Sequence, residues 1–153
     1  MIRFCSEASL RLAVVLIVGC SSQPAKDISS YGASVGIVNH TGKFIHSASV
    51  NGGAGGHMEA WGAGAANVCC VSVPRVWSPG MKLLVRWDMP EGSVHVYKQA
   101  LVEVEKYDET GSVYIHVLPD DVVRVVVSNY DGWSSKHPIP PPKKPNKQLP
   151  PSP

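Results

Sequence analysis

The side chains with the most evident chemical capability lie in and after a glycine-rich stretch, residues 51–70. His57 lies inside it, and Cys69 and Cys70 end it. Zinc binds imidazole and thiolate, but adjacent residues of a strand point to opposite faces, and the usual two-residue gap between paired cysteines is absent. We therefore expect no metal ion at this stretch, and the sequence predicts no metal site elsewhere.

Cys69 and Cys70 have three possible redox states. Strand alternation favours two free, buried thiols that face opposite ways. A vicinal disulfide and pairing with another chain stay open, because close Cα atoms alone do not ensure disulfide geometry.

Two glycine patterns resemble catalytic or nucleotide-binding motifs. Residues 32–36 match G-x-S-x-G, yet that chemistry needs its serine on a strand-to-helix turn, and here a strand-like run follows Ser34. Gly53 and Gly55 would need a third glycine where Met58 stands. We therefore predict that the protein is not an enzyme, has no catalytic residues and carries no cofactor other than a covalent lipid. The glycines are expected to form a long, flexible loop.

Large aromatic and acidic residues in the loops are the candidate contacts for a protein partner. Trp61, Trp77 and Trp133 lie beside glycine or proline, where an indole either covers the end of a sandwich or anchors a partner. Asp88 and Glu91 lie in a predicted turn between them.

Period-two alternation and β-branched residues predict the elements that position these loops. The expected strands cover residues 34–38, 44–50, 68–73, 82–87, 94–106, 112–118 and 122–128. The fifth should bend near Gln99 and Ala100, residues 107–112 should form a hairpin, and the valine-rich last strand should be central. The fold class is therefore all-β: a small antiparallel sandwich or partly open barrel of about seven strands.

The ends of the chain differ in composition from this domain. Residues 1–19 read as a signal peptide, with Arg3 and Arg11 flanking or entering an apolar run that is short for a membrane span. Residues 20–30 suit a tether, residues 31–135 the β-domain, and residues 136–153 a disordered tail rich in proline and lysine.

The junction at residues 17–20 resembles the lipobox of bacterial lipoproteins, which implies lipidation of Cys20. More than one acyl chain would make a stable anchor. Ser21 and Ser22 stand where an aspartate would favour the inner membrane, so the expected location is the outer membrane, facing the periplasm. The folded part shows no basic face, which makes nucleic acid an unlikely partner.

Several motifs together resemble a family of small proteobacterial lipoproteins of unknown function. They are the lipobox, residues 35–41, residues 45–53, residues 68–74, residues 77–80, residues 85–87 and residues 118–121. Members of that family are often encoded beside phospholipase effectors of the type VI secretion system.

The resemblance implies a periplasmic immunity protein that binds such a lipase and occludes it. The contacts would be Trp61, Trp77, Asp88, Glu91 and Trp133. The alternative is a structural or assembly lipoprotein of the envelope, whose basic tail contacts cell wall or another envelope protein. The sequence leaves the oligomeric state open.

Overall fold

A computed structural model gives the structure of this chain and describes residues 29–146. The predicted signal peptide, Cys20 and the last residues of the tail lie outside that range. Within it, no helix is long and apolar enough to span a membrane.

The described chain contains eight β-strands and one short 3₁₀-helix. In chain order they are β1 (Ser30–Asn39), β2 (Ile45–Val50), β3 (Gly53–Met58), β4 (Val68–Pro74), β5 (Lys82–Asp88), β6 (Tyr97–Glu103), β7 (Ser112–Val117), η1 (Pro119–Asp121) and β8 (Val123–Ser128).

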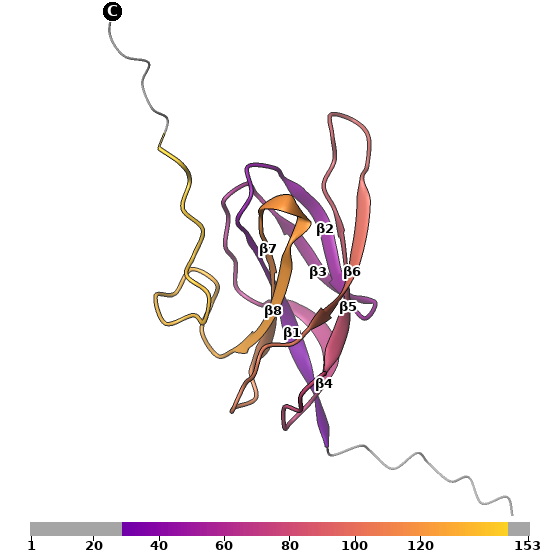
Figure 1. Cartoon of the computed structure of the whole chain (residues 1–153), viewed down its shortest axis with the longest axis vertical. Helices are drawn as coiled ribbons and strands as arrows, with labels where there is room; N and C mark the ends of the chain where they lie inside the picture. Colours follow the sequence, from indigo (N-terminus) through magenta and orange to yellow (C-terminus); the bar gives the residue numbers. More distant parts are fainter. Residues whose placement is uncertain (1–28, 147–153) are drawn as a thin grey trace, which may run out of the picture.

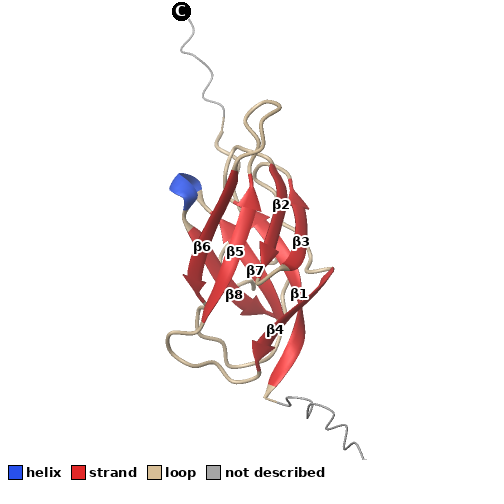
Figure 2. Ribbon diagram, turned by 90° about the vertical axis from the view of Figure 1, so that its right-hand side faces the viewer, coloured by secondary structure: helices blue, strands red, loops and turns tan. Residues whose placement is uncertain are grey.

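The strands form two four-stranded sheets that face each other (Figure 1, Figure 2). The first has the order β4-β1-β7-β8 and the second β3-β2-β5-β6. The predicted all-β sandwich is confirmed, and the sheets do not close into a barrel. Inward-facing residues of both sheets, such as Val35, Ile37, Val85, Val113 and Ile115, are buried in one core.

Two predictions about the middle of the chain are wrong, one for a hairpin and one for a bend within a strand. Residues 107–112 are not a hairpin, because β6 belongs to the second sheet and β7 to the first. β6 also pairs with β5 in unbroken register, without the expected bend at Gln99 and Ala100. The chain instead changes sheets just after β6, where Val104 forms a bridge with Val125 of β8.

The first sheet is mixed rather than antiparallel. β1 lies parallel to β7, with Val35 opposite Val113 and Asn39 opposite Val117, whereas β1 is antiparallel to β4. β1 and β7 therefore end at the same end of the sandwich, and so do the loops that follow them.

The glycine-rich stretch is partly a strand, which corrects the expected flexible loop. β3 pairs with β2 at the edge of the second sheet and lies close to β1 and β4. A Cβ on Gly53 would lie 2.9 Å from the backbone oxygen of Cys70, and one on Gly55 would lie 3.0 Å from Val35. These glycines let β3 approach the other sheet more closely than side chains would allow.

The segment after β8 packs on the outer face of the first sheet. Ile139 joins Val38, Tyr114 and Val126 in a second apolar cluster, and His137 is also buried. β8 is consequently apolar on both faces although it is an edge strand, not the central strand that was predicted. Buried residues of the described chain therefore extend to Ile139.

Candidate functional site

Four loops meet at one end of the sandwich, which we call the loop end: residues 40–44, 59–67, 89–96 and 118–122. This end is uppermost in Figure 1, where the long β5–β6 connection projects beyond the strands. The chain enters β1 at Ser30, at the opposite end.

Asn39 fixes two of these loops to each other. Its side chain is fully buried, and its amide donates hydrogen bonds to the carbonyls of Lys43 at 2.7 Å and Glu59 at 2.9 Å. Its side-chain oxygen accepts from the backbone N–H and the hydroxyl of Thr41. A buried polar group that is fully paired orders the segments around it. The two loops are therefore held in one conformation in the free protein.

A groove of about 370 Å³ opens between these loops. It is lined by Thr41, Gly42, Lys43, Trp61, Met89, Lys98, Leu118, Pro119, Asp120 and Asp121. Trp61 is half-buried there, and its backbone N–H donates to the Thr41 carbonyl.

Two ion pairs frame the groove. Lys43 lies 2.9 Å from Glu91, and Lys98 lies 2.6 Å from Asp121. The hydrogen bond to Glu91 raises the pKa of Lys43 and lowers that of Glu91. Exposed pairs of this kind contribute little to folding. The fold therefore does not depend on these two pairs.

Three residues of the groove adopt left-handed backbone conformations without being glycine. Trp61, Asp120 and Asp121 have φ values of 58°, 58° and 60°. Such conformations are costly for a bulky residue and gather at functional sites. Aspartate tolerates this conformation, so Trp61 is the outlier that makes the loop end a candidate functional surface.

A cluster of His46, Asp88 and His95 lies beside this groove, at the same end of the second sheet. Each residue offers one potential ligand atom, and all three atoms lie within 4.8 Å of one another. His95 Nδ1 is 2.5 Å from Asp88 Oδ2, and the Val96 N–H donates to Asp88 Oδ1 at 3.0 Å.

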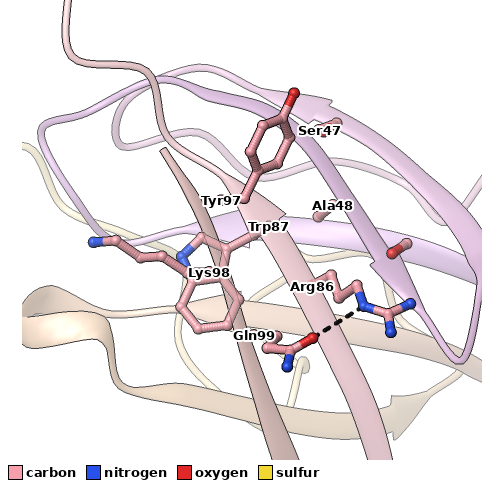
Figure 3. Close-up of a pocket in the computed structure, with 8 residues that line it drawn as sticks. Ser47, Ala48, Arg86, Trp87, Tyr97, Lys98 and Gln99 are labelled. Carbon is pink, nitrogen blue, oxygen red and sulfur yellow. Dashed lines mark hydrogen bonds between the residues drawn. The ribbon is translucent and has the colours of Figure 1, made fainter. Parts of the chain in front are cut away.

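An open groove of about 560 Å³ lies next to that cluster on β2, β5 and β6 (Figure 3). Tyr97 stands at its upper margin, and Arg86 donates to Gln99 at 3.2 Å on its floor. Trp87 also lines it, and its indole N–H has no acceptor within residues 29–146.

Three other histidines form a chain of hydrogen bonds on the first sheet. His40 Nε2 is 2.9 Å from His116 Nδ1, and His116 Nε2 is 3.0 Å from His137 Nε2. His137 Nδ1 donates to the Tyr130 carbonyl at 2.7 Å. Burial lowers the pKa of all three, that of His116 to about 3, so they are neutral at pH 7.

Cys69 and Cys70 are joined in a vicinal disulfide, one of the three states that the sequence left open. Both residues are exposed on β4, an edge strand, which corrects the expectation that they are buried. His57 is exposed on β3 and is not part of any cluster of three metal-ligating groups among the described residues. Ser34 lies within β1 rather than at a strand-to-helix turn.

The predicted partner contacts do not form one surface. Trp61 and Glu91 belong to the loop end, whereas Trp77 lies at the other end, packs on the core and donates to the Val104 carbonyl. Trp133 is 55% exposed on the segment that follows β8. Asp88 is only 1% exposed, so its carboxylate cannot be the exposed loop contact that was predicted.

Sequence reasoning missed the cluster of His46, Asp88 and His95. Asp88 and His95 are seven residues apart, but His46 is distant in sequence, and the register that sets Ser47 opposite Asp88 brings it to them. The available signal was weak: His46 lies near the start of the predicted strand 44–50, and Asp88 directly follows the predicted strand 82–87.

The chain belongs to the family described as "Protein of unknown function (DUF3304)", whose model matches residues 38–125. The matched region contains all four loops of the loop end and the cluster of His46, Asp88 and His95. No curated protein and no solved structure matches the chain.

Proposed function

We propose that this protein is a lipid-anchored, periplasm-facing immunity protein of the outer membrane that binds and occludes a phospholipase effector of type VI secretion. It acts by binding and performs no chemistry of its own. The resemblance to lipoproteins encoded beside such effectors supplies the partner class, and the loop end supplies the surface.

The observation that carries the proposal is the preorganised loop end. Asn39 holds two of its loops together, and Trp61 lies in its groove between two ion pairs. A surface ordered before binding loses less conformational entropy on association, and a tryptophan surrounded by charged residues is a common centre of binding energy.

The direction of the chain agrees with an anchor at Cys20. β1 starts at Ser30 and ends at Asn39, next to the loop end. A membrane tether that precedes Ser30 would therefore leave the loop end facing away from the anchor, toward an arriving enzyme. The anchor would also raise the local concentration of the inhibitor at the membrane under attack.

The test is inhibition of the phospholipase encoded beside this gene. Trp61→Ala and Lys43→Glu should each weaken binding at least about tenfold, as expected for residues at an interface centre. Lys106→Glu is the matched control, because Lys106 forms an exposed ion pair with Asp108 at the opposite end of the sandwich. If the lipase neither binds the wild-type protein nor is inhibited by it, the proposal fails.

The anchor has its own test. Cys20→Ser should remove the lipid mass shift and weaken protection of cells while leaving affinity in solution unchanged. Membrane retention of that variant would contradict lipidation at Cys20.

Removing residues 141–153 separates this function from a structural role in the envelope. The truncation keeps Ile139, the last buried residue of the described range, and so leaves the packing of that range intact. Lipase binding and protection should persist. Loss of envelope integrity with unchanged lipase binding would favour the structural alternative.

A further inference from the structure

The cluster of His46, Asp88 and His95 has the composition of a transition-metal site. Two imidazoles and one carboxylate converge from β2, the end of β5 and the β5–β6 connection. Imidazole nitrogen suits zinc and related ions, whereas magnesium and calcium take oxygen ligands. The chemistry therefore favours zinc.

The carboxylate of Asp88 is held in place by a hydrogen bond and is buried, which is unfavourable for an ionised group. It is 1% exposed, and such burial is unfavourable unless the group is paired. The Val96 N–H holds Oδ1, and His95 is the one side chain within ion-pair distance of Oδ2 in the described part of the chain. A bound cation would compensate this buried charge more fully than one imidazole does.

The two histidines are accessible, and His95 already contacts Asp88. Both are exposed, and their rings meet edge to face with centroids 4.9 Å apart. His46 has no hydrogen-bond partner among residues 29–146. Phe44 and Tyr97 pack beside the two rings and limit their orientations, as apolar neighbours of metal ligands do.

The spacing fits a site that needs only side-chain rotation to bind an ion. Tetrahedral zinc, with bonds of about 2.0–2.2 Å, separates its ligand atoms by roughly 3.3–3.6 Å. The shortest separation here is 2.5 Å, between His95 and Asp88, and all three atoms lie within 4.8 Å. To bind zinc, the two exposed rings would rotate so that the 2.5 Å separation opens and any separation above about 3.6 Å closes, while Asp88 stays in place.

We propose that His46, Asp88 and His95 bind one zinc ion, with the remaining coordination open to water or to a group from a bound partner. Zinc binding by these three side chains does not require the proposed immunity function to be correct, so the two proposals can fail separately. It lies at the loop end, within the region that the family model matches.

The experiment is a zinc titration of the full chain, purified in detergent and stripped with a chelator. Isothermal titration calorimetry gives the stoichiometry and affinity, and NMR of the imidazole nitrogens identifies the ligands. The variants are His46→Gln, His95→Gln and the double variant, with His57→Gln as the matched control because His57 is an exposed histidine of the neighbouring strand. Asp88→Asn is added with its thermal unfolding measured alongside.

We expect one ion per chain, an affinity at least about tenfold lower in each single variant, and an unchanged affinity in His57→Gln. The imidazole signals of His46 and His95 should shift, and those of His40 and His137 should not. The proposal is overturned if the wild type does not bind zinc, if the double variant binds as the wild type does, or if His57→Gln weakens binding equally.

Discussion

Histidines gather in two places in this protein, and the two clusters differ in what their nitrogens can do. His40, His116 and His137 form a buried chain on the first sheet, whereas His46 and His95 lie exposed beside Asp88 on the second. Burial and hydrogen bonding, not residue type, separate the two.

In the buried chain the hydrogen bonds occupy both ring nitrogens of His116 and both of His137. His137 Nδ1 must donate, because its partner is the Tyr130 carbonyl, so its Nε2 accepts from His116. His116 Nδ1 then accepts from His40 Nε2. This direction requires His116 and His137 to be neutral, and it ties the segment after β8 to the sheet. The surface cluster instead keeps His46 unpaired within the described residues, which is what a metal ligand needs.

The largest expected difference between the clusters is their response to acid. Unfolded histidine takes up a proton near pH 6.5, whereas burial holds the folded His116 neutral until about pH 3. The unfolded state therefore binds more protons in this window, and stability falls as the pH drops from 6.5 toward 3. His116 alone accounts for as much as about 4 kcal/mol at pH 3. Urea unfolding at several pH values measures this fall in the free energy of unfolding.

His46→Gln should leave this acid dependence unchanged, because His46 is not in the buried chain. A stability that stays flat between pH 6.5 and 4.5, before most carboxylates titrate, would show that the buried chain is not neutral or not intact.

The second largest effect is expected when the imidazole of His116, the central ring of the buried chain, is removed. His116→Ala leaves the His40 donor and the His137 acceptor without partners and opens a cavity, at a cost of about 3 kcal/mol in the free energy of unfolding. Urea denaturation at pH 7 measures the loss. A cost below about 1 kcal/mol would mean that the chain does not hold the C-terminal segment. His57→Ala, on an exposed strand position, is the control.

Zinc should act on the surface cluster alone. An ion that binds only the folded state at one hundred times its dissociation constant stabilises it by about 2.7 kcal/mol. Thermal unfolding with and without zinc should show this gain in the wild type and in His57→Gln, and at most about half of it in His46→Gln, whose affinity is at least about tenfold lower. An equal gain in His46→Gln would place the ion elsewhere.

The smallest effect is expected when the surface cluster is changed without metal. His46→Gln in the presence of a chelator should alter the free energy of unfolding by less than about 0.5 kcal/mol, because an exposed side chain with no hydrogen-bond partner in the described chain holds little together. A loss above 1 kcal/mol would show that His46 is structural, like His116.

The positions of most strands were predictable, but their partners were not. Alternation located the segments that became β2, β5 and β7, because it depends only on local sequence. The parallel pairing of β1 with β7 and the crossing after β6 join residues distant in sequence. β3 was missed because glycine disfavours strands, and only its close packing on β1 and β4 explains why this one forms.

For the candidate residues too, sequence predicted what depends on local pattern but not what depends on contacts between distant segments. Trp61 and Glu91 were identified from their types and their place in turns, and both lie at the loop end. Asp88 was identified for the wrong role, because composition does not report that its carboxylate is buried under His95 and Val96.

The all-β class, the positions of most strands and the two predicted contacts at the loop end, Trp61 and Glu91, followed from sequence, because hydrophobic alternation and turn chemistry are local properties. Only the tertiary structure decided which histidines are structural and which are available. That choice depends on burial and on hydrogen-bond partners supplied by other strands: His116 meets His40 and His137 in the interior, while His46 meets Asp88 and His95 at the surface.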